Sequence, residues 1–330
     1  MKEIYSINLQ LFADTQVTTQ DSLSLEMKTF YDMTLIDEAS ANLVHDQFGQ
    51  KRPIPKGSGK TIEFRKFSPL AKATAPLTEG VTPNGNSLTV TNITATVEQY
   101  GDFIVQSDVL ELTSLDNTIL EATKLLGKQA GVTLDTVTRN KIQAGTNVTF
   151  CPKVVDGVET EVTKRGDLDD SCQLTVDVIQ QVVAKLRAQN APTINGKYVA
   201  IIHPYVAYDL MRDPEWIDAH KYANPTNLYE GEIGEIAGVR FVQTSEAKIY
   251  DGGVFGTLIF GEGAYGVTEI TGGGLQTIVK QKGSAGTADP LDQRSSVGWK
   301  AIKTAELLIE NYIVRVESKS KRFSATASAN

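Results

Sequence analysis

The chain has 330 residues, of which 41% are hydrophobic and 22% are charged, and its formal net charge is −8. This composition excludes a disordered chain, and no run approaches the 18 apolar residues of a membrane span, so we expect a soluble globular protein. The acidic balance argues against an affinity for nucleic acid over the whole surface, because phosphate binding requires clustered Lys and Arg.

Residues 1–50 are predicted to form an arm and a short helix. The first thirteen residues begin with a charge and turn apolar, but polar residues interrupt the run and no cleavage site follows, so we expect no secretory signal. Residues 14–25 are polar and aperiodic, which is typical of an arm that becomes ordered against a partner. Apolar residues at helical spacing in residues 24–46 predict one or two short helices.

The next stretch predicts a long β-hairpin. Residues 61–67 and 88–97 alternate between apolar and polar side chains, and turn-forming residues separate them. The tip has too few apolar residues to bury anything by itself, so we expect it to need a neighbour. The returning strand carries Thr89, Thr91 and Thr94 with almost no charge. An exposed strand of that kind would be an aggregation hazard in a monomer, which favours a docking surface.

A long helix is predicted from Asp116, the expected N-cap, to Ala144, before a left-handed stop at Gly145. At 1.5 Å per residue it would be roughly 40 Å long and would serve as a spine. Apolar residues at helical spacing form one stripe along this helix, and charged residues lie outside the stripe. The apolar stripe comprises Ile119, Leu126, Ala130, Leu134 and Val137; the residues off it are Lys124, Lys128, Asp135 and Arg139.

Two glycines, Gly127 and Gly131, lie one turn apart in this helix. Each should cost on the order of 1 kcal/mol relative to Ala unless a bend or a close contact uses the missing side chain. We therefore expect a bend or tight packing at this point of the spine.

Helix and strand alternate in the following part of the chain, after a small hairpin that turns at Asp156 and Gly157. This alternation predicts a self-contained α/β lobe over residues 166–283. The expected elements are a helix at 175–189, a buried strand at 197–203, a helix at 204–211, and strands within 231–242, 257–260 and 265–270. Residues 299–316 then predict long β structure with a last strand at 312–317, before a flexible tail with a small basic cluster.

Several patterns resemble functional motifs without meeting their requirements. The run Gly57-Ser58-Gly59-Lys60-Thr61 resembles the end of a phosphate loop, but position 54 is Ile and a strand follows where a helix is required. The triplet of residues 272–274 is more typical of a turn or bulge than of an anion site. We therefore expect no nucleotide site.

The remaining candidates are histidines, acids and thiols. His45, His203 and His220 have no metal spacing, and His203, at the end of an apolar strand, is expected to be structural. The acids Glu161, Asp167, Asp169 and Asp170 fail the calcium-loop pattern and predict a solvated loop. Cys151 and Cys172 match neither a disulfide framework nor a zinc site, so we expect reduced thiols. No catalytic, cofactor-binding or metal-binding residue is therefore predicted.

Five stretches of the chain are similar to major capsid proteins of tailed bacteriophages, specifically the family related to that of phage N-four. Together they span nearly the whole chain, and the order of its parts also resembles the coat-protein fold of these phages. The stretches are NLQLFA, VEQYGDFIVQSDVLELTSLDN, HPYVAYDLMRDPEWIDAHKYA, YEGEIGEIAGVRFVQTSEA and DPLDQRSSVGWKAIKTAELLIENYIVRVE.

The resemblance implies an α+β fold of the Hong Kong-97 type, with a long spine helix, an extended β-hairpin loop and an α/β axial domain. The implied division of the chain has five parts. They are an N-terminal arm and short helix at 1–50, the extended loop at 51–100, the peripheral domain with the spine helix at 101–165, the axial domain at 166–283, and a return strand with the C-terminal tail at 284–330.

The implied function is that of a major capsid protein, which self-assembles as pentamers and hexamers into an icosahedral shell around double-stranded DNA without sequence-specific binding. The implied partners are further copies of the chain, a portal protein, a decoration protein and a separate scaffolding protein, because about 30 residues before the first helix are too few for a fused scaffold. No membrane and no cofactor is implied. The implied location is the virion capsid, after assembly in the host bacterial cytoplasm.

Two other classes of function stay open at this point. An α/β enzyme would need a convergent catalytic set, and a fibre or adhesin-type binding protein would need a signal or a repeat. Neither feature is visible, so the protein is not expected to be an enzyme.

Overall fold

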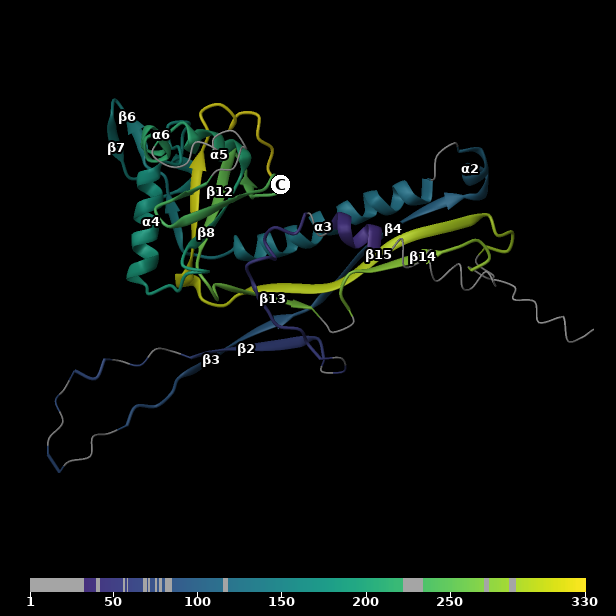
Figure 1. The fold of residues 1–330 in the computed structure, drawn as a ribbon, viewed down its shortest axis with the longest axis horizontal. Coiled ribbons are helices and arrows are strands. Elements are labelled where there is room, and N and C mark those ends of the chain that lie inside the picture. Colours follow the sequence, from purple (N-terminus) through teal and green to yellow (C-terminus); the bar gives the residue numbers. More distant parts are fainter. Residues whose placement is uncertain are drawn as a thin grey trace, which may run out of the picture.

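A computed structural model describes residues 33–330 except 40–41, 56, 58, 68–69, 71, 75, 77–78, 81–84, 115–117, 222–233, 270–272 and 285–288. The fold is L-shaped: a lobe of helices and strands lies at one end of a long arm, and a β-hairpin leaves the base of both (Figure 1). The predicted arm at 1–32, the Asp116 cap and Gly272 lie outside the described residues.

The predicted spine is the helix α3 (Thr118–Ile142), which runs along the arm (Figure 1). Leu126, Ala130 and Leu134 are buried and pack against Trp299 and neighbouring residues of β15 (Arg294–Leu307). The 3.6-residue periodicity of these positions therefore identifies the face that packs on the sheet. Each such Leu contributes about 1.5–3 kcal/mol by leaving water.

Two details of the spine prediction are wrong. Asp135 and Arg139, expected off the buried stripe, are 0% and 1% exposed, because the helix is covered on a second side by polar segments. Gly145 does not adopt a left-handed φ. The carbonyl oxygens at the helix end instead accept hydrogen bonds from the guanidinium of Arg315, which bonds to Gln143 O and, at 3.0 Å, to Gly145 O.

The arm is built on a five-stranded sheet around the long strand β15. Along one edge β15 pairs with the antiparallel strand β4 (Glu98–Ser107), and along the other it pairs with β14 (Gln276–Lys280) and β13 (Tyr265–Glu269). The short strand β1 (Gln50–Lys51) joins β13 in parallel. A helix, α2 (Asp108–Thr113), connects β4 to the segment that leads into α3.

The lobe contains a seven-stranded sheet. Alternate residues of its buried strand β8 face two different cores: Tyr198 and Ala200 pack with helices of the lobe, while Val199 and Ile201 pack with Ile142 at the end of the spine. The strands in order are β5 (Val148–Phe150), β16 (Ile313–Lys319), β12 (Val254–Phe260), β8 (Tyr198–Ile202), β10 (Val239–Gln243) and β9 (Glu235–Ile236), with β11 (Ile249–Tyr250) paired to β12.

Three helices complete the lobe: α4 (Val176–Ala188), α5 (Pro204–Met211) and α6 (Pro214–Lys221). Thr175 caps α4 by accepting the backbone N–H of Val178. The predicted helices and the buried strand of this region are thus confirmed, each within one or two residues of the expected bounds.

Strand pairing differs from the expectation that residues 166–283 are self-contained. The strands β13 and β14 belong to the sheet of the arm, whereas β16, from the last part of the chain, pairs with β12 over seven residues. Local periodicity identifies a strand but does not encode its distant partner, which explains the difference.

The two predicted hairpins are confirmed. In the long one, β2 (Thr61–Phe67) pairs in register with β3 (Val90–Thr96). In the small one, β6 (Lys153–Val155) pairs with β7 (Val158–Thr160), and the turn places Asp156 and Gly157 at φ 51° and 78°. Positive φ at both turn residues matches the right-handed twist of the strands. Two 3-10 turns are η2 (Arg165–Asp167) and η5 (Glu310–Tyr312).

The expectation of a flexible C-terminal tail is wrong. Phe323 stacks on Tyr205 with ring centroids 4.3 Å apart, and the buried Ser324 hydroxyl donates to Gly253 O at 2.8 Å. A side chain at Gly253 would overlap the backbone of Ser324, so the glycine opens the notch that the tail fills. The last residue, Asn330, accepts the backbone N–H of Ile249.

The two spine glycines receive a neighbouring backbone, which confirms the expected tight packing. A helix over residues 33–39 lies along α3, and a Cβ at Gly127 would be 2.8 Å from Leu35 O, while one at Gly131 would be still closer to Ala39 O. Real Cβ atoms do not approach carbonyl oxygens so closely, so the two helices could not keep this separation with alanine.

We predict that Gly127→Ala and Gly131→Ala each lower the free energy of unfolding by about 1–3 kcal/mol, despite the better helix propensity of alanine. Denaturant unfolding measures the effect. The matched control is Gly166→Ala, where a Cβ would meet no atom within 4 Å, and it should change stability by less than about 0.5 kcal/mol. A double variant more stable than the parent would contradict this packing.

Candidate assembly interface

The two glycine-rich motifs that resembled phosphate or anion sites have structural roles in the fold. Gly57 and Gly59 have φ of +89° and lead directly into β2, so the glycine run is a turn before a strand. Gly273 O accepts the backbone N–H of Ile302 at 2.8 Å. The second glycine loop is thus tied to β15, and the first is a turn at the entry to β2.

One carboxylate of the acidic loop, that of Asp169, is paired with neighbouring side chains. The carboxylate of Asp169 lies 2.5 Å from Lys153 Nζ and accepts hydrogen bonds from Ser171, and these donors hold its pKa below the usual range. Within the described part of the chain, no group of three or more His, Cys, Asp or Glu is arranged to hold a metal ion. In the same part, no helix is long and apolar enough to cross a membrane.

Both cysteines are free and buried. Burial raises the pKa of the Cys151 thiol well above its ordinary value, and that of Cys172 is raised for the same reason. A protonated, inaccessible thiol is a poor nucleophile, so neither group is suited to covalent catalysis.

His203 has a structural position. Its Nδ1 accepts the backbone N–H of Tyr205 at 3.1 Å and so caps α5, and its ring lies 4.7 Å from the ring of Tyr205 and 5.1 Å from that of Phe255. Burial lowers the pKa of His203 to about 4, which keeps the imidazole neutral at pH 7. His220 lies in α6.

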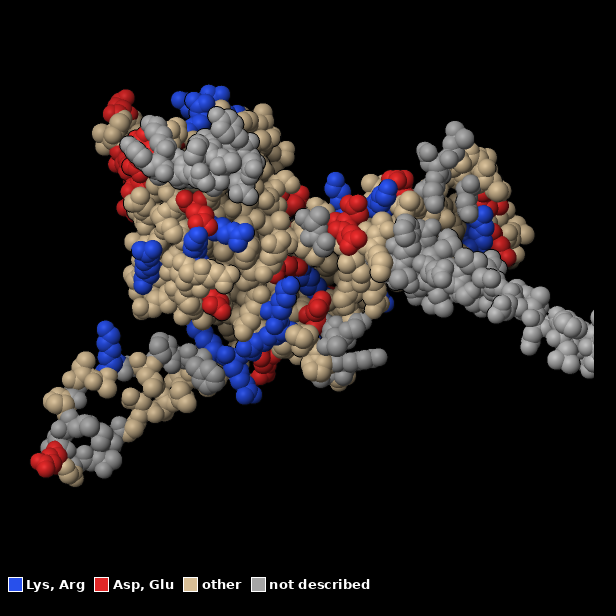
Figure 2. Space-filling view, viewed as in Figure 1, with Lys and Arg blue, Asp and Glu red and all other residues tan. Residues whose placement is uncertain are grey.

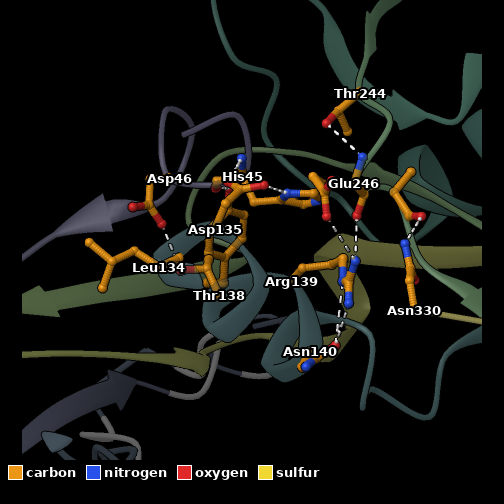
Figure 3. A network of polar contacts seen from close by, with 12 residues as sticks. His45, Asp46, Leu134, Asp135, Thr138, Arg139, Asn140, Thr244, Glu246 and Asn330 are labelled. Atoms are coloured by element: carbon orange, nitrogen blue, oxygen red, sulfur yellow. Dashed lines mark hydrogen bonds and ion pairs between the residues drawn. The ribbon is translucent and has the colours of Figure 1, made fainter. Parts of the chain in front are cut away.

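The most organised polar group in the molecule is a buried junction where the arm meets the lobe (Figure 3). We call it the polar junction. It contains His45, Asp46, Asp135, Thr138, Arg139, Glu246 and Lys303, which come from the segment after the first helix, from α3, from β15 and from a loop of the lobe.

The centre of the polar junction is the pair formed by His45 and Asp135. Both side chains are 0% exposed; His45 Nδ1 lies 2.6 Å from Asp135 Oδ2, and the backbone N–H of His45 donates to Asp135 Oδ1 at 2.7 Å. The hydroxyl of Tyr265 donates to His45 O. One carboxylate of the spine thus fixes both the ring and the backbone of the N-terminal segment.

Two cations extend the polar junction to either side. Lys303, on β15, pairs with Asp46 and donates to Leu134 O at 3.2 Å. Arg139 donates to Glu246 O at 2.7 Å, which ties the spine to the lobe. Removing one partner from such a buried pair is expensive because the other charge stays unpaired. The polar junction therefore holds the lobe, the spine and the sheet in one arrangement.

Sequence reasoning assigned no role to His45 and misplaced Asp135 and Arg139. The one local signal was that Asp135 and Arg139 lie four apart on a long helix. Helical spacing alone would have paired Asp135 with Arg139 themselves. The observed partners are 90 and 107 positions away, since Asp135 meets His45 and Arg139 meets Glu246.

Large apolar side chains are exposed on three surfaces of the molecule. The long hairpin exposes Leu70, Leu88 and Val90, and the small hairpin exposes three valines. The largest group lies on the arm, on β4, α2 and the outer side of the spine. It comprises Phe103, Val105, Val109, Leu110, Leu112 and Leu125, with exposed fractions between 46% and 81%.

These exposed residues differ from scattered surface leucines because they occur together on neighbouring elements. Contiguous apolar patches on a soluble subunit usually mark surfaces that another protein covers. The long hairpin supports the same conclusion: Phe64 and Ala95 at its base are buried on the body, whereas Thr89 and Thr91 farther along are exposed. The subunit thus presents surfaces suited to contacts between copies.

Comparison with known proteins decides between the open classes. The family described as phage capsid protein matches residues 11–259, about three quarters of the chain. The chain belongs to the phage capsid protein family. It is a major capsid protein, and the enzyme and fibre alternatives have no such support. No curated protein matches this capsid protein.

Solved capsids show that the fold of this capsid protein is of the Hong Kong-97 type. It is similar to the capsid of cyanophage P-SCSP1u, with 13% identity, a TM-score of 0.65, and coverage of 84% of this chain and 88% of that one. It is also similar to the capsid of cyanophage Pam1, with 16% identity, a TM-score of 0.63, and coverage of 81% of this chain and 87% of that one. The capsid of Ralstonia phage GP4 is similar at 13% identity, with a TM-score of 0.61 and coverage of 85% of this chain and 89% of that one. The expected α+β class is thereby confirmed.

In a capsid protein the polar junction has a mechanical meaning. The exposed surfaces lie on the hairpin and on the arm, whereas the junction lies inside and connects arm to lobe. Since the junction fixes how these parts sit relative to one another, it determines how the exposed surfaces of one subunit are presented to others.

We predict that Asp46→Ala lowers the free energy of unfolding by about 3–5 kcal/mol, because it leaves the ammonium of Lys303 buried without its carboxylate. Denaturant unfolding of the purified subunit measures the loss. The double variant Asp46→Leu with Lys303→Met removes both charges and should recover most of the stability. A loss below about 1 kcal/mol for the single variant would show that the pair is not a buried constraint.

His203 predicts a pH dependence of stability with a definite sign. Its pKa is lowered from 6.5 to about 4 on folding, so its contribution is complete above pH 6.5 and is lost as the pH falls toward 4. The loss amounts to up to about 3 kcal/mol over this window. Thermal unfolding across pH 4–7 should be flatter for His203→Asn, which keeps a cap acceptor, than for the parent. Parallel curves would contradict the assignment.

Proposed function

We propose that this capsid protein self-assembles as pentamers and hexamers into an icosahedral shell that encloses double-stranded DNA without reading its sequence. The observation that carries the proposal is the long hairpin, whose described residues are buried on the body at the base and exposed farther along. Such a two-stranded ribbon is marginal in water by itself, so it needs a surface on another subunit. In the proposed shell each hairpin lies over a neighbour.

The five parts expected from the sequence are proposed as the working parts of that shell. Residues 1–50 act as the arm, 51–100 as the loop that overlaps a neighbour, 101–165 as the peripheral domain, 166–283 as the axial domain near the ring centre, and 284–330 as the return strand and tail. Two exchanges join the last two parts to their neighbours: β13 and β14 complete the sheet of the arm, and β16 completes the sheet of the lobe. The apolar surface of α2 and β4 supports a second contact, between rings, at the far end of the arm.

We further propose that a separate scaffolding protein directs assembly in the host bacterial cytoplasm, that a portal protein occupies one vertex, and that a decoration protein binds the finished shell. The role is structural and not enzymatic. The proposal is supported by the occupied, paired state of the acidic loop, the glycine loops and His203. Electron microscopy of particles formed on expression, with and without the neighbouring phage genes, tests the shell directly.

We predict that deletion of residues 71–86, the hairpin tip, leaves a folded subunit that cannot form closed shells. The tip adds almost nothing to the subunit core, so stability should change by less than about 1 kcal/mol. Sedimentation and electron microscopy measure assembly. Replacement of the same residues by a Gly-Ser segment of equal length tests whether reach or side chains matter. Normal shells from the deletion would refute the role of the hairpin.

We predict that Val109→Asp with Leu112→Asp blocks the joining of rings but not the folding of the subunit. Both side chains are more than 60% exposed, so the effect on unfolding should stay within about 0.5 kcal/mol for each. Size-exclusion chromatography and microscopy should show free rings or monomers in place of shells. Ile217→Asp, a change of an exposed apolar residue on α6 outside the three apolar surfaces, is the control. Shells of normal yield would exclude the α2 surface from assembly.

A further inference from the structure

The base of the long hairpin carries a concentration of positive charge that contrasts with the rest of the chain. Residues 51–66 contain six Lys or Arg and one Glu, a net charge of +5. Since the whole chain has −8, the remaining residues carry −13. We call this segment the basic root; its cations are Lys51, Arg52, Lys56, Lys60, Arg65 and Lys66.

The cations of the basic root stand out because several of them lie close together in the sequence without a carboxylate partner among the described residues. Among the residues that the structure describes elsewhere, nine ion pairs join Lys or Arg to Asp or Glu in the spine, the lobe and the arm. Apart from Lys56, which lies outside the described residues, none of the basic-root cations forms an ion pair with any described residue. The nearby Glu63 accepts from Asn92 at 3.3 Å instead.

The backbone of the basic root is held by the body of the subunit at both ends of the segment. Lys51 lies in β1, which pairs with β13, and the backbone N–H of Arg52 donates to Val267 O at 3.1 Å. Phe64 is 3% exposed and packs on Gly266, while Arg65 beside it is exposed. Lys and Arg side chains gather over the base of the hairpin in Figure 2. A fixed backbone with outward cations is a preorganised anionic docking surface.

We propose that the basic root binds the acidic surface of a second copy of this chain, and that it guides the hairpin onto its neighbour. This inference rests on the proposed shell, and it assigns the charge that drives the contact. The root is continuous with the hairpin, and the surface of another copy, with −13 outside its own root, has the complementary sign. Double-stranded DNA is the less favoured partner, because the same −13 repels its phosphates.

An electrostatically guided contact has a measurable signature. Unpaired surface charges act over about 10 Å at 0.1 M salt, so association should slow steeply as ionic strength rises. Steering of this kind accelerates association by about tenfold or more. The apolar contacts of the arm do not share this dependence, which separates the two contributions.

The test compares two full-length variants that each lose four positive charges. The first carries Lys51→Gln, Arg52→Gln, Lys60→Gln and Arg65→Gln; the control carries Lys128→Gln, Lys164→Gln, Lys280→Gln and Lys321→Gln, all exposed. Light scattering follows assembly between 50 and 400 mM NaCl, with any scaffolding protein that the parent requires. We expect the root variant to assemble at least tenfold more slowly at 50 mM, with a weakened salt dependence, while the control assembles like the parent.

Each outcome decides a different statement. If parent and control assemble and the root variant matches them, the basic root is not an interface and the inference falls while the shell stands. If the parent forms no shells in any condition, the proposed function falls and the inference with it. Anisotropy of a labelled 30-base-pair duplex is measured in parallel. DNA binding that only the root variant loses, with its assembly unchanged, would overturn the inference in favour of a DNA contact.

Discussion

The burial of charge at the spine is the constraint on which the rest of the subunit depends. A carboxylate such as Asp135 can leave water only if donors surround it, and here the donors come from a segment 90 positions away. Arg139 makes the equivalent demand on a loop of the lobe. Because apolar packing tolerates sliding and charge pairing does not, these residues set one relative position of arm and lobe where hydrophobic contact alone would permit several.

Because buried contacts within the chain fix the fold, the apolar surfaces of the arm and the hairpins are left exposed for other contacts. The interior is specified by paired charges, by two glycines that let helices touch, and by strand β8, which serves two cores at once. The described surface of the subunit exposes leucines and valines on the arm and the hairpins, and lysines of the basic root. In such a subunit the described buried groups are packed or paired within the chain, whereas the exposed apolar patches can be covered only by other molecules.

The amino-acid sequence predicted local elements well and distant contacts poorly. The helix after Thr175, the strand ending at His203 and the turn at Asp156 each follow from neighbouring residues, so capping, periodicity and turn chemistry were sufficient. The pairing of β16 with β12, the docking of Phe323 and the burial of Asp135 depend on residues far away in sequence. The candidate surfaces were visible in part, because the uncharged polar face of the returning hairpin strand is a local property of the sequence.

The position of β16 within its sheet bears on when a subunit becomes usable. This strand, at residues 313–319, lies between β5 and β12, yet it is made long after both of these strands. Until it leaves the ribosome, β12 has an open edge and β5 has no neighbour. A chain that terminates before β16 therefore cannot complete the sheet of the lobe. Such a truncated copy lacks a folded lobe and so cannot be built into a particle.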